Sequence, residues 1–165
     1  DMEKATLRTI KSINIKDKIG IFGDYDVDGA SSTALLGKYF TELKIPYETY
    51  IPDRKKEGYG PSIKSFKELI NNGAKIIFTV DCGTLSFDAI EYAKNNNIDV
   101  IVLDHHQSEV NLPKAFSVVN PNRFDDVEEF DWTMSLTSGK HAFSCGNFDM
   151  LIDLEMKQGY FWQDC

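Results

Sequence analysis

The chain has 165 residues, of which 42% are hydrophobic and 27% charged, values typical of one globular domain large enough to bury a core. No apolar run approaches the ~20 residues of a membrane span, and the N-terminus lacks the basic and then apolar pattern of a signal peptide. The three cysteines are widely spaced and odd in number, so they indicate neither a zinc ribbon nor a disulfide framework and favour a cytoplasmic location.

The net charge of −8 is unevenly distributed along the chain. Residues 1–123 carry 17 acidic and 16 basic side chains, whereas residues 124–165 carry nine acidic and two basic ones. The acidic excess therefore lies in the C-terminal part of the sequence. The overall charge does not exclude a phosphate-bearing substrate for the N-terminal part.

Helices and strands are predicted to alternate along the first 119 residues. Apolar residues recur at helical spacing in residues 2–13, which predicts an amphipathic helix there. Further helices are predicted at residues 30–43, 62–72 and 86–95, and a loop at residues 52–61. Strands are predicted at residues 18–22, 47–51, 74–80, 100–103 and 118–119. Because the strands are near-continuous apolar runs, we expect an α/β fold, a parallel sheet with helices on both faces.

Acidic side chains and two histidines follow three of the predicted strands, at the point where each strand ends. They are Asp24, Asp26, Asp28, Asp81, Asp104, His105 and His106. Because the carboxyl ends of parallel strands meet at one edge of a sheet, we expect these side chains to lie in one region. Alternate residues of an extended segment point the same way, so the first three carboxylates are expected to converge, with Gly29 allowing a tight turn into the next helix.

Crowded carboxylates at a buried edge are costly unless a cation or several hydrogen-bond donors compensate their charge. Mixed carboxylate and imidazole ligands suit Mn²⁺ and similar divalent ions better than thiolate-preferring zinc. Two such ions together polarise a phosphodiester and generate hydroxide from bound water. The pattern therefore predicts a metal or phosphate site.

Each feature has a simpler interpretation when it is taken alone. An Asp-x-Asp pair can cap a helix, a single Asp ends strands in many α/β proteins, and adjacent histidines often lie on a surface. The combination at three strand ends favours a functional site. A phosphatase of the haloacid dehalogenase type also begins with a strand and Asp-x-Asp, but it would leave Asp81 and the histidine pair without a role.

Three short motifs resemble those of the DHH phosphoesterases, in the same order. They are Asp-Tyr-Asp-Val-Asp-Gly at residues 24–29, Val-Asp-Cys-Gly at 80–83 and Asp-His-His at 104–106. Residues 51–61 and 118–123 also resemble linking segments of the RecJ-type single-strand-specific DNA exonucleases within this family. A DHH phosphoesterase N-terminal domain is accordingly predicted for residues 1–123.

The resemblance implies hydrolysis of phosphodiester bonds in single-stranded DNA from a 5′ end, with two Mn²⁺ ions as cofactors and Mg²⁺ as the alternative metal. It implies that Asp26, Asp28, Asp81 and His105 bind the metals and that Asp81 bridges them. Asp24 is implied as an additional ligand or as a hydrogen-bond acceptor behind the ligands.

Further roles follow from the same resemblance. Asp104 is expected to orient a histidine, and His106 to stabilise the charge that develops on the scissile phosphate. Arg54, Tyr59 and Gly60 are expected either to contact the DNA strand or to hold their own loop. The alternative for the basic residues of this segment is a solvated loop.

The sequence also departs from the family pattern. A fourth metal-binding Asp is expected well beyond the histidine pair, and Asp149 and Asp153 lie at suitable distances but in a different context. The fold is therefore expected to be incomplete and the chain to be a fragment with weak or no activity. Residues 124–165 are predicted to be a divergent or foreign tail, with a helix at 147–160 and rapid hydrogen exchange over 124–146.

Two alternative functions remain open from the sequence. One is a DHH phosphodiesterase that hydrolyses short oligonucleotides or cyclic dinucleotides, although the RecJ-like linking segments favour single-stranded DNA. The other is a non-catalytic remnant that folds and binds metal but lacks the fourth carboxylate.

Overall fold

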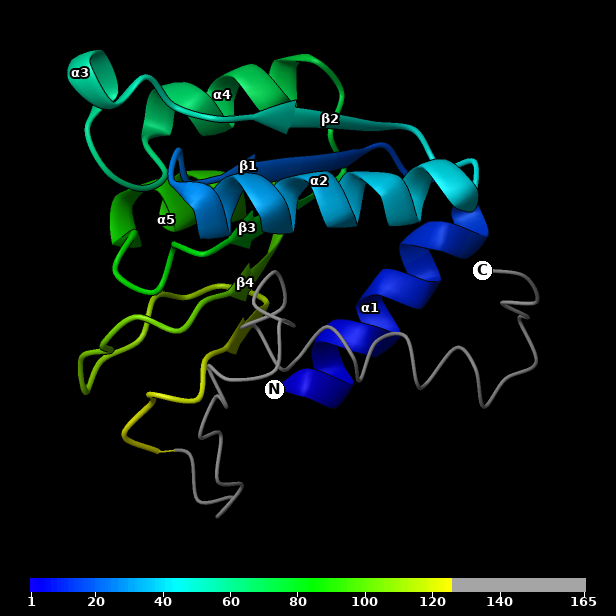
Figure 1. The fold of residues 1–165 in the computed structure, drawn as a ribbon. Helices are drawn as coiled ribbons and strands as arrows, with labels where there is room; N and C mark the ends of the chain where they lie inside the picture. The colour runs from blue at the N-terminus through cyan, green and yellow to red at the C-terminus, as the bar shows by residue number, and fades with distance from the viewer. Residues whose placement is uncertain (126–165) are drawn as a thin grey trace, which may run out of the picture.

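The computed structural model describes residues 1–125, which form an α/β fold around a five-stranded sheet (Figure 1). The strands are β1 (Ile19–Gly23), β2 (Tyr47–Tyr50), β3 (Ile76–Val80), β4 (Asp99–Leu103) and β5 (Ser117–Val119). They lie in the order β2-β1-β3-β4-β5, and each neighbouring pair is parallel. The predicted fold class is confirmed.

Helices cover both faces of this sheet. They are α1 (Met2–Ile15), α2 (Val27–Glu42), α3 (Arg54–Glu57), α4 (Ile63–Asn71) and α5 (Phe87–Asn95). Leu36 and Phe40 of α2 pack with Ile21 of β1 in a core that α1 also joins. On the opposite face, Phe66 of α4 and Ile90 of α5 form a second core with the other side of the sheet.

The double covering explains the burial of the central strands β1 and β3, whereas the edge strand β2 (Tyr-Glu-Thr-Tyr) is half-exposed. In β1, Ile21 belongs to the core under α1 and α2, while its neighbour Phe22 belongs to the core under α4 and α5. All five residues of β1 and all five of β3 are buried. Side chains of successive residues point to opposite faces, so both faces demand apolar residues.

The strand order reverses direction between β1 and β3. From β1 the chain crosses outward to β2, then returns past β1 to β3 and continues to β4 and β5. In open α/β sheets, the crevice for ligands lies outside the carboxyl ends of the strands at this reversal. Asp24 follows β1 and Asp81 follows β3, so both carboxylates lie at that position.

Two local features differ from the prediction. Helix α2 begins at Val27 rather than at residue 30, because the carboxylate of Asp26 caps it by accepting a hydrogen bond from the Gly29 amide at 2.9 Å. The short helix α3 lies within the predicted loop and is capped by Asp53, whose carboxylate accepts from the Lys55 amide at 3.0 Å. A four-residue helix is too short to give a periodic signal.

The predictions for the C-terminal part lie outside the described residues. These are the helix at 147–160, the rapid exchange over 124–146 and the foreign character of the tail; the boundary after residue 123 stays a prediction. Among the helices of residues 1–125, none combines the length and the apolar composition needed to cross a bilayer.

Candidate metal centre

Three buried carboxylates begin the loops that follow β1, β3 and β4. Asp24, Asp81 and Asp104 are each only 2% exposed. Paired strands run β1 to β3 to β4 in parallel register, with Gly23 opposite Val80 and Val80 opposite Leu103. The residues that follow these positions are therefore neighbours at the carboxyl edge of the sheet.

The structure gathers potential ligand atoms into two groups that share one residue. Asp24, Asp26 and Asp81 form the first group, and Asp81, His105 and His106 form the second. Within each group the ligand atoms lie within 4.8 Å of one another. Nε2 of His105 lies 3.1 Å from Oδ1 of Asp81. Asp81 is the carboxylate common to both groups.

Asp28 does not join either group of ligand atoms. Asp28 lies exposed in the first turn of α2, beyond the extended segment that ends at Asp26. Side chains in a helix advance by about 100° per residue instead of alternating, so the argument from alternation does not apply to this residue. The negative charge of Asp28 contributes to raising the pKa of Asp81, and its role as a ligand stays a prediction.

Gly29 acts through its small size and not through a special backbone angle. A Cβ atom on Gly29 would lie 2.6 Å from the Asp24 carbonyl oxygen and 2.7 Å from the Asp24 Cα. The start of α2 is thus packed directly against the backbone that presents Asp24. The expected tight turn is replaced by this close approach of two backbone segments.

Asp81 has the features of a carboxylate that requires a cation. Its backbone has φ +61°, an uncommon conformation for a residue other than glycine. Its buried Oδ2 has no hydrogen-bond partner among the described residues. Burial, followed by the negative charge of Asp26 and hydrogen bonding with that carboxyl, raises the pKa of Asp81 to about 7, with a smaller contribution from Asp28 and an opposing one from His106. The unpaired oxygen and the oxygen and nitrogen donors around it fit Mn²⁺ or Mg²⁺.

Asp104 is held in its ionised form by surrounding hydrogen bonds. Oδ1 lies 2.7 Å from Nδ1 of His106 and accepts from the His105 and His106 amides at 2.8 and 3.1 Å, while Oδ2 accepts from the Thr84 amide at 3.0 Å. Burial alone would raise the pKa of Asp104, but the bonds from Thr84 and His106 outweigh it and lower that pKa. Burial alone would lower the pKa of His106, but the hydrogen bond and charge of Asp104 raise it.

Two asparagines that had been assigned no role brace the Asp-His-His loop. Asn120 is 3% exposed and donates hydrogen bonds to Oγ1 of Thr84 at 2.8 Å and to the His106 carbonyl at 2.9 Å. The side chain of Asn122 donates to the His105 carbonyl, and its amide donates to Oδ1 of Asn120 at 2.8 Å. Their signal in the sequence is an Asn-Pro-Asn run directly after a predicted strand, at the same edge as the other motifs.

The segment between β2 and α4 brings two further predicted residues to this edge. The Tyr59 hydroxyl lies 3.2 Å from Nδ1 of His106 and donates to the Asp81 carbonyl at 3.4 Å. Arg54 stacks its guanidinium 4.8 Å from the ring centre of Tyr25, a residue that follows Asp24 and that the sequence did not indicate. Gly60 is buried with φ +78°, so it shapes the turn and offers no side chain to a ligand.

Comparison with known proteins matches most of the chain to one family. Residues 18–139 match the model of the DHH family, N-terminal domain. The chain is 38% identical over 122 residues to the single-stranded-DNA-specific exonuclease RecJ of Bacillus subtilis and 37% identical over 125 residues to that of Escherichia coli. These matches cover 74% and 75% of the chain, but only 16% and 22% of the two relatives.

Solved structures agree with these sequence matches. A crystal structure of exonuclease RecJ bound to manganese superposes with a TM-score of 0.77 and 27% identity, covering 97% of this chain and 38% of that one. A crystal structure of RecJ from Thermus thermophilus in complex with Mn²⁺ has the same fold, with a TM-score of 0.70. The chain therefore belongs to the DHH family and is related, over the part that matches, to the RecJ exonucleases.

Proposed function

We propose that this chain is the metal-binding half of an exonuclease that hydrolyses phosphodiester bonds in single-stranded DNA from a 5′ end. The observation that carries the proposal is the sharing of Asp81 between two groups of ligand atoms at the reversal of the strand order. The names of the matched relatives and the manganese in two related structures support the same reading.

The metal site in this proposal takes two Mn²⁺ ions, with Mg²⁺ as the alternative. Asp24, Asp26 and Asp81 would hold one ion, Asp81 and His105 would hold the other, and Asp28 would be a further ligand. When bound, such ions polarise the phosphodiester and lower the pKa of a bound water so that hydroxide forms near neutral pH. The unpaired Oδ2 of Asp81 supports its bridging role.

The roles of Asp104 and His106 follow from their hydrogen bond. The Asp104 carboxylate accepts from Nδ1 of His106, which fixes the ring orientation and leaves Nε2 for the substrate. With its pKa raised, His106 would donate a hydrogen bond from Nε2 to an oxygen of the scissile phosphate and so stabilise the negative charge that develops there. In the hydrolysis, the water oxygen bonds to phosphorus, the bond from phosphorus to the sugar oxygen breaks, and the proton released by the water ends on that sugar oxygen.

The substrate contacts are assigned to the segment between β2 and α4. Arg54, exposed and stacked on Tyr25, offers a guanidinium to the DNA backbone near the metal site. Tyr59 lies 56% exposed beside His106 and contacts the nucleotide at the scissile phosphate. Gly60 holds the turn that presents Tyr59. These contacts act on backbone and ring faces, so they suit a substrate of any sequence.

The test is cleavage of a 5′-labelled single-stranded oligonucleotide in the presence of manganese, compared with a duplex. Three chains are compared: the natural chain, Asp81→Ala, and Glu91→Ala as a matched loss of one exposed carboxylate on α5. We expect at most weak cleavage of the single strand by the natural chain, the same level by Glu91→Ala, and none by Asp81→Ala. Manganese binding without cleavage would identify a non-catalytic metal-binding module. Preferred cleavage of dinucleotides or cyclic dinucleotides would instead support the alternative function, a DHH phosphodiesterase of short oligonucleotides or cyclic dinucleotides.

A further inference from the structure

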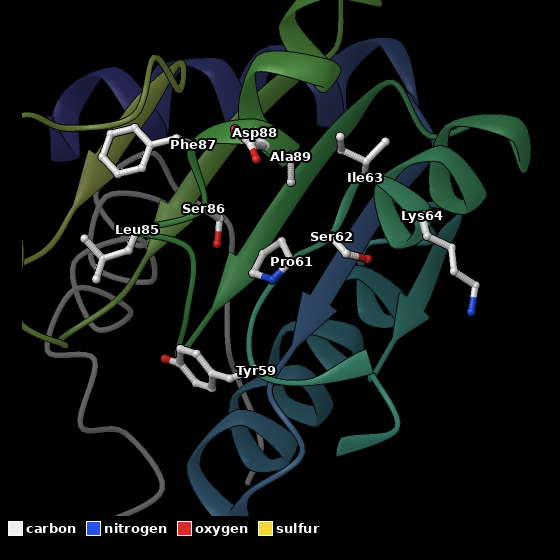
Figure 2. Close-up of a pocket in the computed structure, with 10 residues that line it drawn as sticks. All are labelled: Tyr59, Pro61, Ser62, Ile63, Lys64, Leu85, Ser86, Phe87, Asp88 and Ala89. Carbon is white, nitrogen blue, oxygen red and sulfur yellow. The ribbon is translucent and has the colours of Figure 1, made fainter. Parts of the chain in front are cut away.

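A pocket of about 590 Å³ lies next to the candidate metal centre, between the N-terminal ends of α4 and α5 (Figure 2). Tyr59 forms one end of this pocket and also contacts the centre, through its hydroxyl 3.2 Å from Nδ1 of His106. The two sites therefore share one side chain. The volume lies within the range of ~300–1,000 Å³ that small-molecule sites occupy.

The wall of the pocket combines polar and apolar side chains. Tyr59, Ile63, Leu85 and Phe87 line it and are 56%, 47%, 52% and 37% exposed. None of the four belongs to either hydrophobic core of the described residues. Exposed apolar residues are ordinary when they stand alone, but these four surround one hollow and are available to contact a ligand there.

The charges around the pocket balance. Lys64 and Asp88 are its only charged lining residues, one of each sign, and Nζ of Lys64 already lies 3.6 Å from Glu57. The side-chain charges therefore do not select a phosphate group. The aromatic and aliphatic side chains offer contacts to the flat face of a nucleotide base.

Few hydrogen-bonding groups in the pocket are free to read the identity of a base. The hydroxyl of Ser62 is engaged in capping α4, where it accepts from the Ser65 amide at 3.2 Å. Ser86 stands at the N-cap of α5 without a side-chain capping bond, so its hydroxyl can turn toward a ligand. One rotatable hydroxyl, able to donate or to accept, accommodates different bases and discriminates poorly among them.

We propose that this pocket receives the base of a nucleotide joined to the phosphate at the metal centre. The inference rests on the proposed function, because it assumes that a nucleotide strand reaches that centre. Tyr59 lies between the two sites, with its hydroxyl at the centre and its ring at the pocket. The base contacts Leu85 and Phe87, and this contact holds the strand in place while its phosphate meets the ligand groups.

The experiment changes the pocket and the base separately and then together, as in a double-mutant cycle. Fluorescence anisotropy in the presence of manganese measures how tightly the full chain and a Leu85→Ser, Phe87→Ser variant bind a short single strand with uncleavable linkages. Matched strands lack the base on one or the other side of the target phosphate. A control variant, Leu7→Ser with Ile15→Ser, removes two exposed apolar side chains from α1, on the other face of the sheet.

The natural chain and the control are expected to bind the intact strand about tenfold more tightly than one of the abasic strands. The pocket variant is expected to bind both strands equally, with an unchanged thermal unfolding midpoint. The proposal would be overturned if the pocket variant also bound the intact strand tenfold more tightly than the abasic strand. It would also be overturned if the natural chain bound the two strands equally.

A parallel cleavage assay separates this inference from the proposed function. If binding depends on the base but no strand is cleaved, the pocket proposal is supported and the exonuclease proposal is contradicted. If the strand is cleaved and the pocket variant still depends on the base, the exonuclease proposal is supported and the pocket proposal is contradicted. A natural chain that does not bind the strand at all overturns both.

Discussion

Oδ1 of Asp104 lies 2.7 Å from Nδ1 of His106, and the same oxygen accepts hydrogen bonds from the backbone amides of His105 and His106. Asp104 thus fixes the orientation and the charge of one histidine without belonging to either group of potential metal ligands. A residue in this position should affect the proton on His106 more than it affects the affinity for metal.

Asp104→Asn is expected to lower kcat about 10²–10⁴-fold and to lower manganese affinity by a much smaller factor. The carboxylate raises the pKa of His106, so its loss lowers that pKa. If protonated His106 is the active form, activity falls as pH rises through this pKa, and in the variant the fall moves to lower pH. Kinetics across pH and a manganese titration measure the two effects. Asp99→Asn, at the other end of β4, is the control, and equal losses of metal affinity and kcat would contradict the assignment.

Asn120→Asp is expected to destabilise the chain and loosen the metal site together. The substitution removes the two donated bonds to Thr84 and to the His106 carbonyl and places a negative charge beside that carbonyl. Leaving these buried acceptors without donors costs about 2 kcal/mol in the free energy of unfolding. We expect manganese affinity to fall about 10–100-fold, as for other residues that hold metal ligands in place. Urea unfolding and calorimetric titration measure both, with the exposed Asn95→Asp of α5 as the control.

Asp81→Asn is expected to abolish stabilisation by manganese without lowering the stability of the metal-free chain at pH 8. Burial raises the pKa of Asp81 from 3.8 to about 7, so the carboxyl supports the metal-free fold below pH 3.8 and this contribution is lost as pH rises toward 7. Asparagine keeps the tolerance for φ +61° but carries no charge, so in EDTA the variant should equal or exceed the natural chain in stability at pH 8.

Manganese is expected to reverse this order. At about 100 times its dissociation constant, a ligand stabilises a protein by about 2.7 kcal/mol, and only the natural chain should gain this. Thermal unfolding at pH 5 and pH 8, with EDTA or manganese, gives the four comparisons. A variant stabilised by manganese as much as the natural chain would show that Asp81 is not a ligand.

The sheet could be predicted from the sequence because its physical cause is local. Apolar runs such as residues 76–80 are needed wherever a strand is buried on both faces, and each run ends at the residue that leaves the sheet. Parallel pairing then brings Asp24, Asp81 and Asp104 to one edge without any knowledge of tertiary contacts. The start of α2 had a local signal as well, since Asp26 is a favourable capping residue.

The details of the site depend on contacts between residues far apart in the chain. Asn120 meets Thr84 across 36 positions, and Arg54 meets Tyr25 across 29, and no periodicity encodes such pairs. The positive φ of Asp81 and its unpaired Oδ2 arise from three strands that end together. The sequence therefore supplies the chemistry of the centre, while its geometry requires the packed fold.

Gly29→Ala is expected to reverse the usual preference of helices for alanine. In an ordinary helix position the change stabilises by about 1 kcal/mol, but here the new Cβ would lie 2.6 Å from the Asp24 carbonyl oxygen, a backbone atom that cannot move away freely. The clash should cost about 1–3 kcal/mol and displace Asp24, which lowers manganese affinity. Gly37→Ala in the same helix meets only the Tyr47 ring, at 3.1 Å, and this edge-strand side chain can shift. Urea unfolding and manganese titration of both variants test the comparison, and equal behaviour would show that Gly29 does not position Asp24.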